Sequence, residues 1–191
     1  MNIPPTNRLR FRLMDPTSAH DRELWFELDQ DPEVMRYLND SQPTARDEMD
    51  DFVVPRVASF TDPARGHGLW ELADKQSGEH LGWILVRCYR FDKPEREEDN
   101  IELGWRLKRA HWNRGITTEA AGAIIEVLQQ DPAIRAFSAL AAPENRASIG
   151  VMKKLGMHFV DERFHLIDGR PPYASVYYEM PSPNWMTQLN C

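Results

Sequence analysis

The spacing of apolar residues in the first third of the chain predicts one strand followed by helices. Residues Leu9–Met14 alternate apolar and basic side chains, which is typical of a half-buried strand. Helical periodicity follows in three stretches, at residues 15–30, 31–40 and 44–60. The second stretch opens with Asp31 as a cap and Pro32 at the first helical position, and the third is expected to be interrupted near Pro55.

The remaining pattern predicts strands separated by turns and by two further helices. Residues Gly68–Asp74 and His80–Phe91 form a predicted hairpin, because the turn-forming sequence KQSGE lies between them. After a charged loop (92–99) come the strand Asn100–Leu107, a helix, and the apolar strand Ala133–Ala142. A short helix (143–156) and two strands (157–166 and 173–180) that flank a turn (167–172) follow.

The order of these elements indicates the fold class. A strand–helix–strand unit in the middle implies a crossover between parallel strands, whereas the other connections favour antiparallel pairs. We therefore expect a mixed α/β (α+β) sheet and not a doubly wound one. With 191 residues, we expect a single domain over residues 1–191, with a core at about 8–180 and a C-terminal tail at 181–191.

Composition excludes several classes of protein. The chain is 41% hydrophobic and 28% charged, and no apolar run approaches the ~20 residues that span a membrane. The first ten residues lack the apolar core of a signal peptide, so we expect a cytoplasmic protein without membrane contacts. Cys88 and Cys191 are the only cysteines, which supports neither a disulfide scaffold nor a thiolate metal site, and we expect no metal.

The formal net charge of −7 argues against a nucleic-acid partner, because phosphate contacts require clustered Lys and Arg side chains. The same charge suits a cationic partner or substrate, and solubility alone explains it equally well. We expect no nucleic acid among the partners.

A candidate anion site lies where the strand Asn100–Leu107 leads into the next helix. Residues Arg114–Thr118 occupy the start of that helix, where the first backbone N–H groups have no intrahelical partners and attract negative charge. Arg114 adds a cation and Gly115 allows close approach of the backbone, so a pyrophosphate fits. Neither the nucleotide loop G-x-x-x-x-G-K nor the dinucleotide motif G-x-G-x-x-G is present. One glycine at a helix start is by itself more typical of plain loop geometry.

A second helix carries a polar residue on an otherwise apolar face. Asn145 is the expected N-cap, and Ser148 leads a stripe at i, i+3, i+4, i+7 that runs to Leu155. Gly156 follows at the usual position for a helix end. From the spacing alone, Ser148 is either a first-turn serine bonded to the backbone or a side chain of a functional site.

Three segments in order, "DQDPEVMRYL", "IELGWRLKRAHWNRGITTEA" and "APENRASIGVMKKLGMHF", resemble the GCN5-related N-acetyltransferases (GNAT), specifically their RimJ/RimL-like branch. The resemblance covers roughly residues 8 to 180. It implies the GNAT fold, a central and mostly antiparallel twisted sheet of about six or seven strands. A splayed parallel pair lies in the middle of that sheet, and helices flank it.

The resemblance identifies the expected anion as the pyrophosphate of acetyl-CoA, which serves as co-substrate. The loop pattern Arg/Gln-x-x-Gly-x-Gly/Ala falls on residues 112–117, with departures at its first and last positions. The residues implied in cofactor binding are Leu107, Lys108, Trp112, Asn113, Arg114, Gly115, Ile116, Thr117, Thr118 and Asn145. Of these, Leu107 and Lys108 are expected to bond the pantetheine by main chain, and Asn145 to hold the cofactor or the helix entry. A bulge near Gly104-Trp105 is expected to aim an N–H at the thioester carbonyl.

The resemblance also assigns catalytic roles. Many members protonate the leaving thiolate with a tyrosine at the position of Met152, which cannot serve, so Ser148 is the candidate general acid. Glu102, on the strand beside the thioester, is the candidate base, and pairing with a basic neighbour is the alternative for it. His111 or water could replace Glu102 as base, although a packing role suits His111. Glu119 is expected to be structural.

The acceptor implied is a primary amine, either a protein N-terminus or a small molecule, attacked directly in a ternary complex. The helical region Ser18–Phe60 and the loop Asp92–Asp99 are expected to border it. Five aromatic residues could line its pocket, but their strand spacing is more typical of core: Trp25, Trp70, Trp83, Tyr89 and Trp105. A catalytically weak acyl-CoA-binding or assembly module on the same fold is the alternative function. Whether the chain forms a homodimer stays open.

Overall fold

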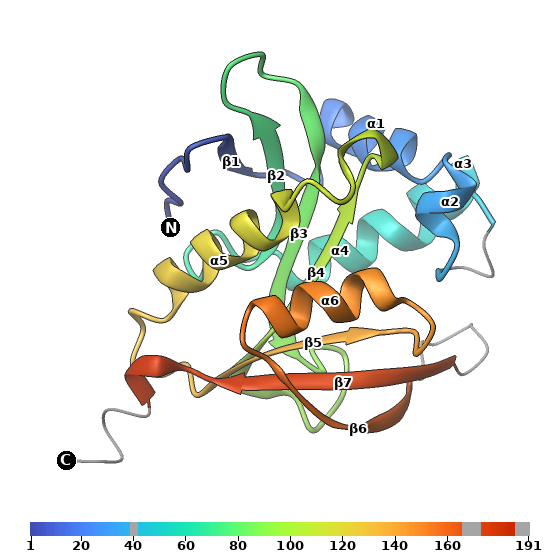
Figure 1. Cartoon of the computed structure of the whole chain (residues 1–191). Coiled ribbons are helices and arrows are strands. Elements are labelled where there is room, and N and C mark those ends of the chain that lie inside the picture. The colour runs from blue at the N-terminus through green and yellow to red at the C-terminus, as the bar shows by residue number, and fades with distance from the viewer. Residues whose placement is uncertain (39–41, 166–172, 186–191) are drawn as a thin grey trace. The chain divides into compact units, whose positions relative to one another are not determined.

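The computed structural model describes residues 1–38, 42–165 and 173–185. The strands are β1 (Leu9–Leu13), β2 (Gly68–Asp74), β3 (His80–Tyr89), β4 (Glu97–Leu107), β5 (Ala136–Ala141), β6 (His158–His165) and β7 (Tyr173–Pro181). They belong to one sheet of seven strands with the order β1-β2-β3-β4-β5-β7-β6 (Figure 1). The pair β4–β5 is parallel, and β1–β2, β2–β3, β5–β7 and β6–β7 are antiparallel. The mixed sheet with a parallel pair in its middle is therefore confirmed. The turn predicted at 167–172 lies outside the described residues.

The helices are α1 (Ala19–Leu28), α2 (Pro32–Met35), α3 (Arg46–Glu48), α4 (Val54–Phe60), α5 (Ile116–Leu128) and α6 (Arg146–Lys154). The expected cap is present at α2, where the Asp31 side chain accepts from the Glu33 N–H. The interruption predicted near Pro55 is a π-helical turn, Met49–Val53, directly before α4. Proline has no N–H and therefore fits the first turn of the helix that restarts there. No helix in the described part of the chain has the length and apolar character of a membrane span.

Strand β4 begins at Glu97, inside the segment predicted to be a charged loop. The Arg135 guanidinium lies 3.1 Å from a Glu97 carboxylate oxygen and 3.2 Å from one of Asp99. The Arg135 N–H also donates to the Asp99 carbonyl (2.7 Å). A cation from a distant segment thus compensates the acidic start of the strand, which a local pattern cannot show.

Two other boundaries differ from the sequence pattern. Strand β5 begins at Ala136 and not at Ala133, because the N–H groups of Ala133 and Ile134 close a turn onto Asp131. At the other end, β7 includes Pro181, and the buried Ser182 donates its N–H to the Arg135 carbonyl (2.7 Å). Ordered backbone therefore continues past the predicted start of the tail.

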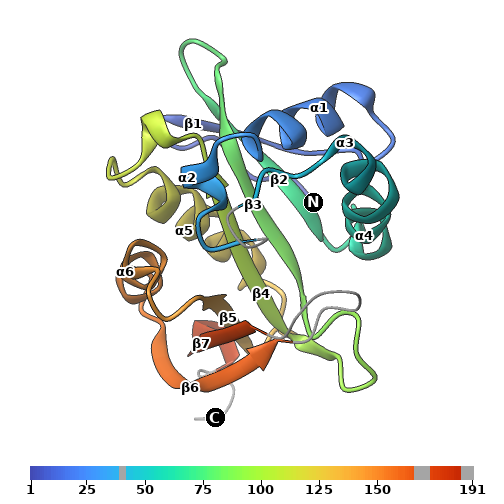
Figure 2. The ribbon, with the colours of Figure 1, turned by 90° about the vertical axis from the view of Figure 1, so that its right-hand side faces the viewer.

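The chain forms two compact units, Met1–Arg87 with Trp105–Ile124 and Cys88–Gly104 with Ile125–Cys191, and each is described by itself. In the first unit β1, β2 and most of β3 form an antiparallel meander. Helices α1 and α4 lie on one side of β2 and β3, and the first turns of α5 lie on the other (Figure 2). At Gly82 of β3, a Cβ atom would stand only 2.2 Å from the Arg106 carbonyl oxygen, so only glycine allows this approach to β4.

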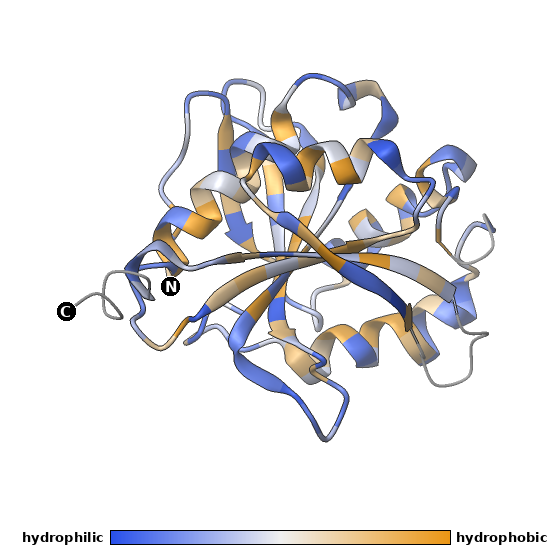
Figure 3. Ribbon diagram, turned by 60° about the horizontal axis from the view of Figure 1, so that its bottom comes forward, coloured by the Kyte–Doolittle hydropathy of each residue, from blue (hydrophilic) through white to orange (hydrophobic). Residues whose placement is uncertain are grey.

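In the second unit β5, β7 and β6 form an antiparallel layer, to which the first part of β4 adds a parallel strand. Helix α6 covers one face of β5 and β7 (Figures 1 and 2). Figure 3 shows the strands largely in apolar colours and many connecting loops in polar ones. Burial agrees, since Phe137, Ala139 and Met152 have no exposed surface. This unit therefore has an apolar layer between α6 and the strands.

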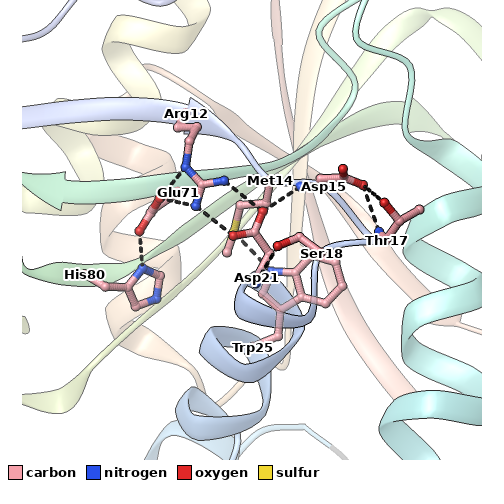
Figure 4. A network of polar contacts seen from close by, with 9 residues as sticks. All are labelled: Arg12, Met14, Asp15, Thr17, Ser18, Asp21, Trp25, Glu71 and His80. Carbon is pink, nitrogen blue, oxygen red and sulfur yellow. Dashed lines mark hydrogen bonds and ion pairs between the residues drawn. The ribbon is translucent and has the colours of Figure 1, made fainter.

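A polar network in the first unit ties α1 to the sheet (Figure 4). The Arg12 guanidinium donates to both carboxylate oxygens of Asp21 (2.8 Å each) and also contacts Glu71, which lies 3.0 Å from His80 Nδ1. The His80 bond lowers the pKa of Glu71 most; burial opposes it, and Arg12 lowers the pKa further. Burial pushes the pKa of Asp21 upward, but the bonds from Arg12 and the Asp15 N–H outweigh it, and the pKa lies below its ordinary value.

Glu71→Gln is expected to destabilise the protein by about 1–2 kcal/mol at pH 7, because Arg12 and His80 lose a charged acceptor. Since the folded state lowers the pKa of Glu71 from 4.5, its contribution is present above that pH and is lost as the pH falls. Urea unfolding of both proteins between pH 7 and pH 3.5 should show the difference narrowing at the acid end, with the exposed Glu126→Gln as control. A difference that is constant with pH would mean that Glu71 acts by shape alone.

Candidate functional site

The loop between β4 and α5 has the backbone geometry of an anion nest. Residues 112–115 are exposed, and α5 begins directly after them at Ile116. Asn113 and Gly115 have φ angles of 58° and 73°, in the left-handed region, and Gly115 is followed by helical backbone. Alternation of left-handed and right-handed residues turns successive N–H groups toward one point and makes an anion-binding concavity. The structure thus provides a geometry that the sequence pattern of one glycine could only suggest.

The first turn of α5 adds further donors to this loop. The Glu119 N–H donates to the Gly115 carbonyl (3.1 Å), which is the first bond of the helix. The N–H groups of residues 115–118 precede that bond and have no intrahelical acceptor. They stand at the positive end of the helix dipole, where a phosphate group is stabilised.

His111, which stands before the loop, is held by neighbours on both sides of its ring. Its Nε2 lies 3.3 Å from Glu79 Oε1, and its Nδ1 lies 3.3 Å from Arg114 Nη1. Because Arg114 can only donate, Nδ1 acts as acceptor and Nε2 carries the proton toward Glu79. The side chain is buried. These contacts favour the packing role of His111 over that of a base.

Trp112 packs back onto the end of β4 through its indole N–H, which donates to the Leu107 carbonyl (2.9 Å). The Lys108 N–H donates to the Leu81 carbonyl (2.9 Å), and the Lys108 carbonyl accepts from the His111 N–H (3.0 Å). Pantetheine binding by Leu107 and Lys108 stays a prediction. It would use the Leu107 N–H or the second lone pairs of these two carbonyl oxygens.

Glu119 has the structural role expected of it. Its carboxylate accepts from the Thr6 hydroxyl (2.5 Å), from the Arg8 N–H (3.2 Å) and from Arg8 Nε (2.6 Å). Burial pushes the pKa of Glu119 upward, but these bonds outweigh it and hold the pKa below its ordinary value. The N-terminal segment is thereby fixed to the first turn of α5.

In the second unit, the parallel ladder between β4 and β5 is short. Among the described residues it consists of three pairs, Asn100–Ala136, Ile101–Phe137 and Glu102–Ser138, although β5 continues to Ala141. The part of β5 beyond Ser138 is paired with β7 on its other edge only. A short parallel ladder is what the expected splayed pair requires.

Glu102 is buried and stands in a row of polar residues across three strands. It pairs with Ser138, which in turn pairs with Glu179 of β7, so the three side chains share one face. On the same face, the Asn100 amide donates to the Tyr177 hydroxyl (2.9 Å) and to Glu179 (3.1 Å). The polar face beside Glu102 is therefore continuous.

The sequence pattern did not single out Asn100, Ser138, Tyr177 or Glu179. Burial, together with the bond to the Glu179 carboxylate, raises the pKa of Tyr177 well above its usual range, so the hydroxyl stays protonated. The buried Ser138 Oγ and Asn100 Oδ1 have no acceptor or donor among the described atoms. The spacing of Tyr177 and Glu179, two residues apart on one strand, was the available signal.

Ser148 and Asn145 meet at the start of α6. The Asn145 side chain accepts from the Ser148 N–H (3.1 Å), so Asn145 is the N-cap, as expected. The cap uses the main chain of Ser148 and leaves the helix start independent of its hydroxyl. Met152 is fully buried, as a core side chain, and Gly156 with φ 90° follows the helix.

The structure divides the predicted site residues between the two units. The first unit holds Leu107, Lys108 and the loop 112–118, and the second holds Glu102, Asn145 and Ser148. The core role of Trp25, Trp70, Trp83 and Tyr89 is confirmed, since each is at most 9% exposed, whereas Trp105 is half-buried. Within residues 1–38, 42–165 and 173–185, no group of three or more His, Cys, Asp or Glu side chains could hold a metal ion.

Known proteins similar to this chain are acetyltransferases where their names describe them. Residues 8–158 match the acetyltransferase (GNAT) domain family. The Bacillus subtilis (strain 168) protein YkkB is 31% identical over 157 residues, which cover 81% of this chain and 84% of YkkB. The FsC-acetyl coenzyme A-N(2)-transacetylase of Aspergillus fumigatus is 26% identical over 188 residues, which cover 96% of this chain and 78% of that protein.

A solved structure of RimL, a ribosomal alpha-N-protein acetyltransferase in complex with coenzyme A, has the same fold. The TM-score is 0.70 at 16% sequence identity, and the match covers 94% of this chain and 97% of that chain.

Proposed function

Because this chain belongs to the acetyltransferase (GNAT) domain family, we propose that it transfers the acetyl group of acetyl-CoA to a primary amine. The observation that carries this proposal is the nest formed by Asn113, Gly115 and the start of α5. Such a loop suits the pyrophosphate of coenzyme A, which the named relatives use. The loop residues 112–118 bind the pyrophosphate, Leu107 and Lys108 the pantetheine, and Asn145 the cofactor or the entry to α6.

The proposed reaction is direct attack in a ternary complex. The amine nitrogen forms a bond with the acetyl carbon, and the bond between that carbon and the coenzyme sulfur breaks. Glu102 accepts a proton from the amine, directly or through water, and Ser148 supplies a proton to the leaving thiolate. Main-chain N–H groups near Gly104 stabilise the charge on the carbonyl oxygen. The chain's own residues thus supply every proton that the transfer requires.

The proposed acceptor is a protein N-terminus or a small amine. One named relative modifies an N(2) position and another acts on a protein alpha-amino group, and both kinds of acceptor are primary or secondary nitrogen nucleophiles that a neutral-amine mechanism serves. We also propose the RimJ/RimL-like branch, on the segments around Asp31, Gly115 and Ser148.

A catalytically weak acyl-CoA-binding module is the second candidate. The fully buried Met152 favours it, because this side chain stands where many family members place a tyrosine acid and cannot titrate. Thr117, at a position that favours glycine or alanine, points the same way. Both candidates bind the coenzyme, and turnover distinguishes them.

Coenzyme binding is tested first by stability. Acetyl-CoA and free CoA at about a hundred times their dissociation constant are expected to stabilise the folded protein by about 2.7 kcal/mol. The measurement is urea or thermal unfolding with each ligand, and NAD and ATP at equal concentration serve as controls. A protein whose unfolding responds to neither acetyl-CoA nor CoA would not be an enzyme of this class.

Glu102→Gln is expected to flatten the rise of turnover with pH and to lower the rate at pH 7 by about 10²-fold, the lower end for a positioned base, because water also accepts protons. An amine acceptor is mostly protonated near neutral pH, so the loss is largest at low pH. The measurement is the pH–rate profile with one acceptor at saturating acetyl-CoA. The exposed Glu98→Gln on the same strand is the matched control. Parallel profiles would assign Glu102 to positioning and would leave the base to water or His111.

A further inference from the structure

Arg8, which directly precedes β1, reaches the proposed coenzyme loop. Its Nη1 donates to the carbonyl oxygen of Arg114 (2.9 Å), inside the loop. Its Nε donates to Glu119 Oε2 (2.6 Å), and Nη2 lies 2.6 Å from the same oxygen. Nη2 is also the heavy atom nearest to where a Cβ of Gly115 would stand (3.7 Å). One side chain therefore touches both the nest and the first turn of α5.

The bond from Arg8 to the Arg114 carbonyl fixes the orientation of one peptide of the nest. In a trans peptide the C=O of one residue and the N–H of the next point in opposite directions. Because Arg8 holds the Arg114 carbonyl on its own side, the Gly115 N–H is directed to the other side. Gly115 is the residue most free to let this peptide rotate, since both signs of φ are open to it.

The Arg8 side chain is itself held in place. Glu119 accepts from the Arg8 guanidinium, from the Arg8 N–H and from the Thr6 hydroxyl. The Lys75 N–H donates to the Arg8 carbonyl (2.7 Å), and Lys75 Nζ donates to the Thr6 carbonyl (2.8 Å). Glu119 also balances the positive charge of Arg8, so the pair acts on the loop through geometry more than through net charge.

We propose that Arg8 is a positioning residue for coenzyme binding, which orients the Arg114–Gly115 peptide so that the Gly115 N–H faces the pyrophosphate. This inference rests on the proposed function, because it assigns the loop to coenzyme A. Arg8 sets the affinity for the coenzyme and takes no part in acetyl transfer. Its guanidinium fork is required, because a lysine ammonium cannot span both the Arg114 carbonyl and the Glu119 carboxylate.

The test compares Arg8→Ala, Arg8→Lys and the control Arg10→Ala, an exposed arginine on the neighbouring strand. Isothermal titration with CoA and with dephospho-CoA, which keeps the pyrophosphate, measures the dissociation constants. Both Arg8 variants are expected to bind each ligand roughly tenfold more weakly, the size of one charge-assisted hydrogen bond. Arg10→Ala, which removes the same charge, should stay within about twofold. In the transfer assay, KM for acetyl-CoA should rise while kcat is unchanged.

Each alternative result overturns the proposal in a distinct way. A loss with CoA but not with dephospho-CoA would make Arg8 a direct contact of the 3′-phosphate. Full affinity in Arg8→Lys would mean that positive charge suffices and orientation is not the cause. Unchanged affinity in both variants would leave the proposed function intact and remove the role of Arg8. Absence of CoA binding by the unmodified protein would instead refute the proposed function. Melting of the unliganded variants shows that each is folded, and a drop in kcat without a change in KM would contradict a positioning role.

Discussion

Gly115→Val is expected to weaken acetyl-CoA binding by about 100-fold or more, the loss expected when several charge-assisted hydrogen bonds fail together. Gly115 has φ 73°, and a β-branched residue is strongly disfavoured there. Valine would drive the backbone toward negative φ, and the Gly115 and Ile116 N–H groups would no longer converge. The branched side chain would also stand in the path of the phosphates. The measurement is titration with CoA, together with the loss of ligand-induced stabilisation.

The matched control is Gly122→Ala in the same helix, where an added Cβ meets nothing within 4 Å. This change should preserve binding and stabilise the helix by about 0.4–1 kcal/mol. Gly115→Ala should fall between the two, because it adds the backbone strain without the branched side chain. Near-normal CoA affinity in a folded Gly115→Val protein would show that the loop does not bind the pyrophosphate.

Ser148→Ala is expected to lower kcat by about 10²–10⁴-fold, the usual contribution of a positioned general acid. The dissociation constant of acetyl-CoA should change little. The structure makes this substitution informative, because Asn145 caps α6 through the Ser148 N–H and the cap survives without the hydroxyl. A thiolate needs less help from an acid when the pH exceeds the pKa of an ordinary thiol, about 8.5. The deficit in turnover should therefore shrink as the pH rises past that value.

Ser59→Ala, at an exposed helical serine, is the control for loss of a hydroxyl. It should leave kcat and its pH dependence unchanged. If Ser148→Ala retains nearly full turnover, Ser148 is not the acid and is a first-turn serine of α6. A deficit that is equal at all pH values would point to a role in positioning and not in proton transfer.

Local signals predicted most of the elements. The capping residues Asp31 and Asn145 mark helix starts that the structure confirms, and the alternation at Leu9–Met14 gave the first strand. Predictions failed where a distant partner decides the outcome. The acidic start of β4 was predicted to be loop, because the compensating Arg135 lies 38 residues from Glu97 in sequence.

The same distinction applies to the candidate site. The position of the loop follows from a strand, a glycine and a helix in order, so Arg114–Thr118 could be found from the sequence. The left-handed Asn113 and the contact of Arg8 with the Arg114 carbonyl could not, because they depend on backbone angles and on a partner 106 residues away. The polar row of Glu102, Ser138 and Glu179 depends on strand register, which no local period specifies.

The central claim, acetyl transfer from acetyl-CoA to an amine, is tested most directly by a panel of acceptors. The purified chain is incubated with acetyl-CoA and each of a set of small amines and peptides with free N-termini. Release of the coenzyme thiol and the acetylated product are measured together, the product by mass spectrometry. We predict that at least one amine yields thiol and acetylated product in equal amounts, and that Ser148→Ala slows both equally. A protein that binds acetyl-CoA tightly but releases no thiol with any amine would contradict the enzyme and leave the acyl-CoA-binding module.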